Sequence, residues 1–255
     1  MKILLVNDDG INFKGIRFLE QAFSKDHEVI LVAPSNERSG FSHSVTIFSP
    51  ISYTKLDGKN EEYSVDGTPA DCIKLAVLYL LKDRLPDFII SGINSGPNLG
   101  CDTMYSGTVG AAAEGVFMGI PSIAVSLGFW TQKDPAYIGA ADFIKRNLDT
   151  LYRLSKKHQG KALFNINYPI SGFKGVRFTK TGINSYDDFF DFVEEEKGKV
   201  RMQLKGQTIT HRLDKGDCDV AYIKEGYATI TPLMLDKTCH KLLKNYKQDK
   251  TIKFT

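Results

Sequence analysis

The chain opens with the stretch MKILLVNDDG, residues 1–10, and this stretch decides the fold. Ile3 to Val6 form a short apolar run with β-branched members, which predicts a buried strand that ends in a turn. Asp8 and Asp9 follow at the carboxyl end of that strand, where open α/β sheets bind their ligands. Two adjacent carboxylates repel each other unless a positive charge lies between them, so a hard divalent cation is a natural ligand. Taken alone, the same letters also fit an Asx-rich turn that caps the next helix.

The segments that follow extend this strand into a sheet. Apolar residues recur at helical spacing over 16–23, and residues 28–33 form a second apolar run closed by Pro34. Strand, helix and strand in about 30 residues make a βαβ unit with a right-handed connection. The pattern predicts further strands at 45–48, 51–56, 62–65, 87–90, 121–126, 163–167, 220–224 and 227–231, and helices at 68–81, from 106, at 136–154 and from about 235. The predicted fold is α/β, a doubly wound, Rossmann-like and mainly parallel sheet.

The alternating pattern ends near residue 171, which predicts a catalytic core at 1–170 and a smaller C-terminal region at 171–255. Within that region, residues 186–195 and 199–207 flank a Lys-Gly turn and predict a long β-hairpin. Its aromatic side chains exceed what a free-standing two-stranded ribbon can bury. We therefore expect the hairpin and the basic terminal helix to pack on the core or on a second copy of the chain, as a homodimer or homotetramer.

The composition excludes several kinds of partner. A net charge of +3 over 255 residues is too small for a nucleic-acid-binding surface, and the longest apolar runs fall far short of a membrane span. Four scattered cysteines without a CxxC pair indicate a reducing compartment rather than disulfides or a zinc site. Because the first residues show no signal-peptide pattern, a cytoplasmic location is expected.

Three polar loops are expected at one edge of the sheet: residues 7–10, 35–44 and 91–108. Their polar side chains are mainly carboxylates, hydroxyls and amides, and oxygen-rich ligation favours Mg²⁺, Mn²⁺ or Ca²⁺ over Zn²⁺. The third loop ends in the letters SGT, residues 106–108, at a helix N-terminus, where backbone N–H groups make an anion pocket. A hard cation beside an anion pocket indicates phosphate chemistry.

Several familiar sites are absent from the sequence. There is no GxGxxG after the first strand, no GxxxxGK[ST] and no GxSxG, which excludes a dinucleotide fingerprint, a P-loop and a nucleophile elbow. The Asp8-Asp9 pair also resembles the acidic pair of receiver domains in two-component signalling, which bind Mg²⁺. The corresponding central loop, residues 91–100, offers no aspartate to phosphorylate. A non-catalytic, Mg²⁺-binding, receiver-like regulatory module stays as the alternative function.

An ordered set of motifs resembles the SurE family of survival-protein nucleotidases, and it spans nearly the whole chain. The motifs are NDDG at 7–10, ERSG at 37–40 followed by His43 and Ser44, GTPADC at 67–72, SGIN at 91–94, GPN at 96–98, YSGTVGAAAEG at 105–115, GIPSIAVS at 119–126 and EGYATITPL at 225–233. Any single motif is weak, whereas their order is highly specific. The hairpin region from about 186 to 214 matches the family least.

The resemblance implies a metal-dependent phosphomonoesterase that hydrolyses nucleoside monophosphates. This would be a 5′-nucleotidase with one divalent cation per subunit, Mg²⁺ or Mn²⁺, and with 3′-nucleotidase and exopolyphosphatase as side activities. By position, the resemblance implies the cation ligands Asp8, Asp9, Ser39 and Asn94. It implies the phosphate-binding residues Asn98, Ser106, Gly107 and Thr108.

The mechanism expected from this resemblance is in-line attack on phosphorus by a metal-activated water. Asp8 or Asp9 would orient or deprotonate that water, and His43 in the second loop could donate a proton to the leaving alkoxide. A covalent aspartyl-phosphate is the rival mechanism, but the DxD spacing common to enzymes that form one is absent from this strand end.

Overall fold

The computed structural model of this 255-residue chain describes all residues except 184–185, 209–215 and 249–255, so these parts of the predicted C-terminal region lie outside the described residues. Its strands are β1 (Lys2–Val6), β2 (Glu28–Pro34), β3 (Ser52–Leu56), β4 (Glu61–Asp66), β5 (Phe88–Asn94), β6 (Ser122–Leu127), β7 (Ala162–Tyr168), β8 (Val176–Phe178), β9 (Tyr186–Glu196), β10 (Lys199–Thr208) and β11 (Ala228–Met234). Its helices are α1 (Lys14–Phe23), α2 (Pro69–Leu75), the π-helical turn η1 (Ala76–Leu80), the 3₁₀ turn η2 (Gly100–Met104), α3 (Gly107–Phe117), α4 (Asp134–Arg146), α5 (Leu148–Lys157), α6 (Asp219–Lys224) and α7 (His240–Gln248).

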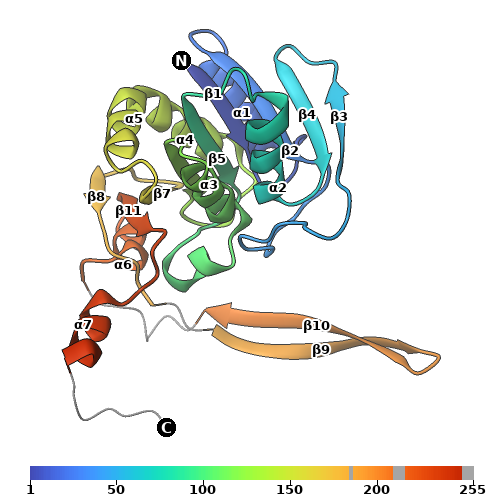
Figure 1. Ribbon diagram of the computed structural model, residues 1–255. Helices are drawn as coiled ribbons and strands as arrows, with labels where there is room; N and C mark the ends of the chain where they lie inside the picture. The colour runs from blue at the N-terminus through green and yellow to red at the C-terminus, as the bar shows by residue number, and fades with distance from the viewer. Residues whose placement is uncertain (184–185, 209–215, 249–255) are drawn as a thin grey trace.

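The predicted doubly wound sheet is confirmed. Nine strands lie in the order β3-β4-β2-β1-β5-β6-β7-β11-β8, and β4, β2, β1, β5, β6 and β7 are parallel to one another (Figure 1). From the central strand β1 the chain first winds outward through β2, and later returns to the other side of β1 at β5. The order of strands therefore reverses between β1 and β5, which is where sheets of this kind bind ligands.

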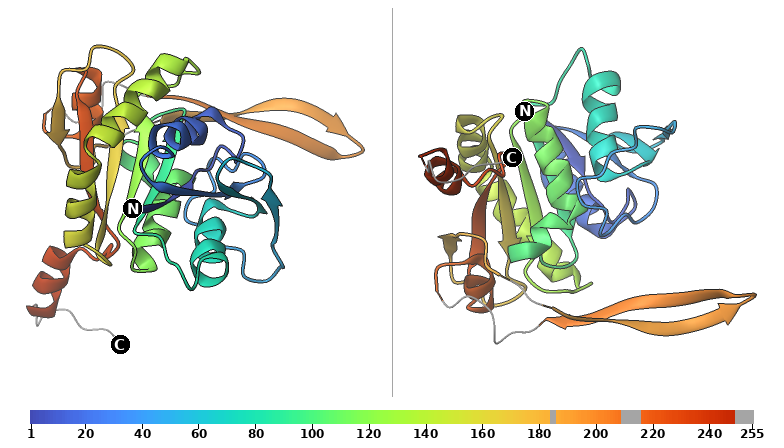
Figure 2. Two further views of the ribbon diagram at one scale, coloured as in Figure 1. Left: turned by 90° about the horizontal axis from the view of Figure 1, so that it is seen from above. Right: turned by 60° about the horizontal axis from the view of Figure 1, so that its bottom comes forward.

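Helices cover both faces of this sheet, as Figure 2 shows, which explains why residues 3–6 of β1 are all apolar. Ile3 and Leu5 pack in one core cluster with residues of α1, α4 and α5, whereas Leu4 and Val6 pack in another with residues of α2 and α3. Side chains alternate between the two faces of a strand, so a strand that is covered on both sides is apolar throughout.

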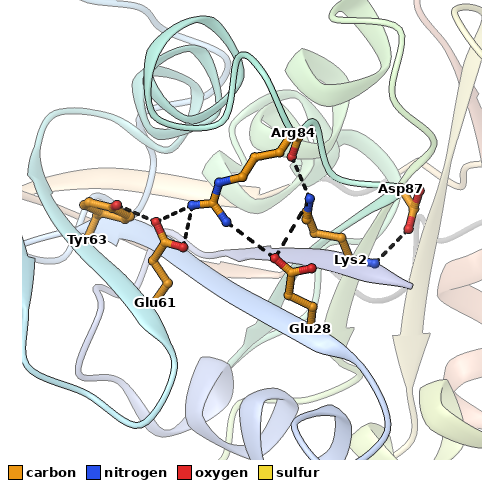
Figure 3. A network of polar contacts seen from close by, with 6 residues as sticks. All are labelled: Lys2, Glu28, Glu61, Tyr63, Arg84 and Asp87. Carbon is orange, nitrogen blue, oxygen red and sulfur yellow. Dashed lines mark hydrogen bonds and ion pairs between the residues drawn. The ribbon is translucent and has the colours of Figure 1, made fainter.

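A network of polar contacts joins the amino ends of the parallel strands (Figure 3). The Arg84 guanidinium donates to Glu61 at 2.5 and 2.6 Å and to Glu28 at 3.4 Å, and Lys2 Nζ donates to the Arg84 carbonyl at 3.0 Å. The Lys2 backbone N–H donates to Asp87 Oδ2 at 2.7 Å. These contacts lie at the ends of β1, β2, β4 and β5 that are opposite to the three polar loops, so we assign them to holding strands rather than to chemistry.

The hairpin of β9 and β10 is confirmed. It forms a separate two-stranded antiparallel sheet that extends away from the body of the molecule (Figure 1). Lys197 and Gly198 both have positive φ, 50° and 76°, as a two-residue hairpin turn requires. Phe192 pairs with Met202 across the two strands, and Phe190 pairs with Leu204. Residues two apart on a strand point to the same face, so all four side chains share one face of the ribbon, and all four are exposed.

Three predicted elements differ from the structure in the core. Residues 45–48 form no strand, because the backbone N–H and hydroxyl of Thr46 bond to the Asp71 carboxylate instead of to a neighbouring strand. The helix predicted at 68–81 is α2 followed by the π-helical turn η1. The helix predicted at 136–154 is α4 and α5, which meet at Asn147, whose side-chain amide donates to the Phe143 carbonyl at 2.8 Å.

The C-terminal region differs at two further places. The strand predicted at 220–224 is the short helix α6, while β11 joins the main sheet between β7 and β8 instead of pairing with it. A short apolar run such as VAYI fits both periods, and tertiary packing selects the helix here by burying Val220 and Ile223. The terminal helix α7 begins at His240 rather than near 235. Within the described ranges, no helix is both long enough and apolar enough to cross a membrane.

Candidate active site

The turn after β1 is closed by the side chain of Asn7. Its amide nitrogen donates to the Gly10 carbonyl at 2.9 Å, and its amide oxygen accepts from the Gly10 N–H at 3.2 Å. Gly10 has a φ of 107°, which a residue with a side chain rarely adopts. This closed Asx turn orients Asp8 and Asp9 at the carboxyl end of the central strand.

Asp8 is buried against the first turn of α3. Its Oδ1 accepts a short hydrogen bond from the Thr108 hydroxyl. A Cβ on Gly107 would lie 2.8 Å from Asp8 Cβ and 3.0 Å from Oδ2, so only glycine lets α3 approach this closely. Ser106 caps α3, because its hydroxyl accepts from the Val109 N–H at 3.1 Å. The helix N-terminus favours the ionised form of a carboxylate placed there.

One carboxylate oxygen of Asp9 has no hydrogen-bond partner among the described residues. Asp9 Oδ1 lies 3.5 Å from Ser95 Oγ, whereas the buried Oδ2 has no hydrogen-bond partner in the described part of the chain. Burial, followed by the charges of Asp8 and Glu37, raises the pKa of Asp9 from 3.8 to about 8. Burial also raises the pKa of Asp8, although the Thr108 hydrogen bond opposes this effect. A buried pair of this kind fits a divalent cation, which would restore both negative charges.

The neutral ligands predicted for that cation, and two of the predicted phosphate-binding residues, line the same cavity as Asp8. Ser39, Asn94, Asn98 and Ser106 border this space of about 540 Å³ with Asp8. Ser39 Oγ donates to Glu37 Oε1 at 2.9 Å, so its oxygen lone pairs can still bind a cation. The Asn94 amide nitrogen donates to the Gly96 carbonyl at 2.9 Å, which makes its oxygen the atom suited to coordination.

The cation set would have to mix charged and neutral oxygens. Within the ranges that the structure describes, no group of three or more His, Cys, Asp or Glu side chains could hold a metal ion. Asp8, Asp9, Ser39 and Asn94 supply two carboxylates, one hydroxyl and one amide. This is an oxygen-only set, which suits Mg²⁺ or Mn²⁺ better than Zn²⁺.

Asn98 is held rigidly by two asparagines of β7. Its backbone N–H donates to Asn167 Oδ1 at 2.9 Å, and its carbonyl accepts from Asn165 and Asn167 at 2.7 and 3.0 Å. Its side-chain amide donates to Ser126 Oγ at 2.7 Å. Asn165 and Asn167 were missed from the sequence, although two asparagines inside an otherwise apolar strand are a signal that polar groups must be satisfied there.

A comparison with known families identifies the chain. A family model described as "Survival protein SurE" matches residues 3–188. The chain belongs to the SurE family.

Full-length relatives in this SurE family support the assignment. The chain is 41% identical to the "5′-nucleotidase SurE" of Alkaliphilus metalliredigens, over 97% of this chain and 98% of that protein. It is 39% identical to the protein of the same name from Syntrophomonas wolfei, over 97% and 94% of the two chains. The crystal structure of the SurE protein from Aquifex aeolicus superposes with a TM-score of 0.80 at 33% identity, over 98% of this chain and all of that one.

His43, the predicted proton donor of this SurE-family chain, faces another part of the molecule. Its Nε2 lies 2.7 Å from Glu114 Oε2, and its ring packs on Phe117. It lines a second cavity of about 190 Å³ that is distinct from the one bordered by Asp8. Burial alone would raise the pKa of Glu114, but the hydrogen bonds of His43 and Lys74 outweigh it and lower that pKa. The structure therefore does not bring His43 together with the carboxylate pair.

Two residues at the site were not singled out from the sequence. Glu37 belongs to the ERSG motif and is close enough to raise the pKa of both aspartates, a charge effect that requires the folded loop. Trp130 lines the same cavity as Asp8. Its position three residues after the buried strand β6 of the parallel sheet was the available signal, because ligands bind at that edge.

Proposed function

We propose that this SurE-family chain is a metal-dependent phosphomonoesterase that hydrolyses nucleoside monophosphates, a 5′-nucleotidase with 3′-nucleotidase and exopolyphosphatase side activities. The observation that carries the proposal is the Asp8-Asp9 pair, with Asp8 buried against the N-terminus of α3 and a buried Asp9 oxygen that has no partner among the described residues. The names of the full-length relatives support the choice of nucleotides as substrates.

In this proposal, one Mg²⁺ or Mn²⁺ per subunit is held by Asp8, Asp9, Ser39 and Asn94. When bound, such an ion polarises a phosphoryl oxygen and lowers the pKa of water. The phosphoryl group lies in the cavity near Asn98 and Ser106 at the first turn of α3, where Gly107 permits close approach. Asp8 is fixed by Thr108, so Asp9 is the better placed of the two carboxylates to orient the attacking water and accept its proton.

His43 has a positioning role in this proposal. Its contact with Glu114 on α3 holds the loop that carries Ser39 against the helix that carries Thr108. The Ser42 hydroxyl ties the same loop to η2 by donating to the Met104 carbonyl at 2.6 Å. The proton for the leaving alkoxide would then come from solvent in the open cavity.

Phosphate release tests the proposed activity directly. The purified chain is incubated with AMP, GMP, CMP and a short polyphosphate, first with EDTA and then with Mg²⁺ or Mn²⁺ added back. We expect release from the monophosphates that disappears with EDTA and returns with either metal. Metal binding without any release would instead support the receiver-like alternative, and a trapped phosphoprotein would support the aspartyl-phosphate mechanism.

The Thr108 hydroxyl provides a sharper test of the site. In Thr108→Val the side chain keeps its shape but no longer donates to Asp8, so we expect kcat/KM for AMP to fall about 10- to 100-fold. Thr108→Ser keeps the hydroxyl and is expected to stay close to the wild type. Steady-state kinetics at saturating Mg²⁺ compare the three proteins, and equal losses in both variants would contradict the role assigned to this hydrogen bond.

We further propose that the exposed face of the hairpin joins two or more copies as a homodimer or homotetramer. Phe190→Asp places a charge on the face shared with Leu204, and we expect it to lower the molar mass measured by light scattering. Phe189→Asp is the matched control, because Phe189 lies on the same strand but on the opposite face. A monomeric wild type, or an equal effect of both substitutions, would overturn this proposal.

A further inference from the structure

The cavity that Asp8 borders is also lined by apolar side chains that the proposed phosphate chemistry does not use. Leu99, Tyr105, Phe129, Trp130 and Ile223 line it. Trp130 is 72% exposed, although an indole gains most when it is buried. Large aromatic side chains that stay exposed at a cavity mark a place where a ligand binds.

The indole of Trp130 lies with one face against Gly96, and its other face is open to solvent. A Cβ built on Gly96 would collide with the two carbon atoms that the indole rings share, Cδ2 and Cε2. Ring atoms flank that shared bond on both sides in the plane, so Gly96 must approach it from the face. Gly96 therefore backs one face of the indole, and the high exposure of Trp130 places solvent on the other.

Hydrogen bonds on either side of Trp130 hold the backbone that carries the indole. The Thr131 N–H donates to the Ser95 carbonyl at 3.1 Å, and the hydroxyl of the buried Tyr137 donates to the Thr131 carbonyl at 3.1 Å. The Gly128 N–H donates to the Tyr168 carbonyl at 2.7 Å. Because this backbone is already fixed, less conformational freedom is lost when a ligand stacks on the ring.

The same short loop joins the indole to the carboxylates. Asn94 borders the cavity with Asp8, Ser95 lies next to Asp9, and Gly96 lies under Trp130. Two residues of chain span at most about 7 Å, which is the scale of the sugar that separates a base from its phosphate. A ligand with an aromatic ring at one end and a phosphate at the other fits this arrangement.

We propose that the open face of Trp130 is the platform on which the base of the nucleotide stacks. This inference rests on the proposed function and adds the group that recognises the nucleoside. Stacking accepts every base because each has a π-face, and it favours the larger purine rings over pyrimidines. Trp130 thus selects nucleotides over phosphate esters without a base, and purine over pyrimidine nucleotides.

Fluorescence tests binding without any need for turnover, because Trp130 is the one tryptophan of the chain. Adenosine, which has no phosphate to release, is titrated into the wild type while the emission of the indole is recorded. We expect saturable quenching by adenosine and none by ribose 5-phosphate. The absence of quenching by adenosine, or equal quenching by both compounds, would overturn the platform whether or not the chain releases phosphate.

Kinetics of substituted proteins then measure the contribution of the ring. In Trp130→Ala we expect KM for AMP to rise about tenfold or more with little change in kcat, because a stacked base typically contributes that much. KM for ribose 5-phosphate should stay unchanged, and the preference for AMP over CMP should disappear. Trp130→Phe should recover most of the affinity for AMP. If Trp130→Ala raises KM for AMP and for ribose 5-phosphate equally, the ring supports the loop and does not bind the base.

Discussion

Replacing Asp9 with asparagine is expected to reduce phosphate release from AMP by at least about a hundredfold. The same change should raise the melting temperature of the protein in metal-free buffer. The reason for the gain is that the wild type buries two adjacent carboxylates, and Asp9 Oδ2 has no partner within the described residues. Asparagine has no ionised form, so the folded state no longer has to keep this carboxyl protonated or hold its charge beside Asp8, which we expect to stabilise the fold on the order of 1 kcal/mol, or about 2–4 °C.

The dependence on pH gives this prediction a definite sign. In the folded protein the pKa of Asp9 is raised from 3.8 to about 8, so the folded state holds a proton that the unfolded state has already lost between these values. The free energy of unfolding of the metal-free wild type should therefore fall as the pH rises from about 4 to 8. Asp9→Asn should flatten this decline. Adding Mg²⁺ at neutral pH should raise the melting temperature of the wild type much more than that of the variant.

Asp219 provides a control, because its replacement by asparagine is expected to lower the melting temperature instead of raising it. It is also buried with a pKa raised by burial, but its carboxylate accepts from the N–H groups of Gly100, Gly182 and Val220. Asp219→Asn should therefore lower the melting temperature, because one oxygen acceptor is replaced by a donor. Differential scanning calorimetry of both variants decides the matter. A loss of stability in Asp9→Asn as large as that in Asp219→Asn would show that the Asp9 carboxylate has hydrogen-bond partners that stabilise the fold, which contradicts its assignment as an unpaired cation ligand.

Gly15→Ala is expected to destabilise the fold on the order of 3 kcal/mol, which is roughly 6–12 °C in melting temperature. The first turn of α1 lies directly on β5, and a Cβ at Gly15 would collide with the backbone carbonyl of Ile93. Backbone atoms cannot rotate away as a side chain can, so the helix would have to shift. Since Ile93 precedes Asn94, we also expect weaker cation binding, measured by titration of Mg²⁺ against activity.

Gly139→Ala is the matched control, because it makes the same change in the middle of a helix. A Cβ there would lie 3.1 Å from the ring of Tyr168, a side chain that can adjust. The gain in helix propensity, up to about 1 kcal/mol, should offset the contact. Thermal unfolding curves of the two variants test the difference. If both substitutions proved equally tolerated, α1 could not be packed against β5 as closely as described.

Much of the fold was predictable because its signals are local. The apolar run of β1, the spacing of α1 and the capping box of Thr68 and Asp71 each depend on residues a few positions apart. The order of the elements also required the three polar loops to meet at one edge of the sheet, since parallel strands place their carboxyl ends together. The predicted association of Asp8, Ser39 and Asn94 around one cavity follows from that order.

The errors arose where distant residues decide the local conformation. Residues 45–48 have the composition of a strand, but the backbone N–H of Thr46 donates to the Asp71 carboxylate instead of to a neighbouring strand. Residues 220–224 have the letters of either element, and helix α6 forms where burial of Val220 and Ile223 selects it. Local periodicity cannot resolve such short runs, because several elements satisfy the same pattern.

The sequence by itself determined the parallel sheet, the long hairpin, the SurE family and the carboxylates at the end of the first strand. Only the tertiary structure decided that His43 faces Glu114, that two asparagines of β7 hold Asn98, and that Gly96 lies under the ring of Trp130. The physical reason is the separation along the chain of the residues that interact. Strand periodicity, helix caps and motifs act between neighbours in the chain, whereas side-chain contacts and burial join residues that only the folded chain brings together.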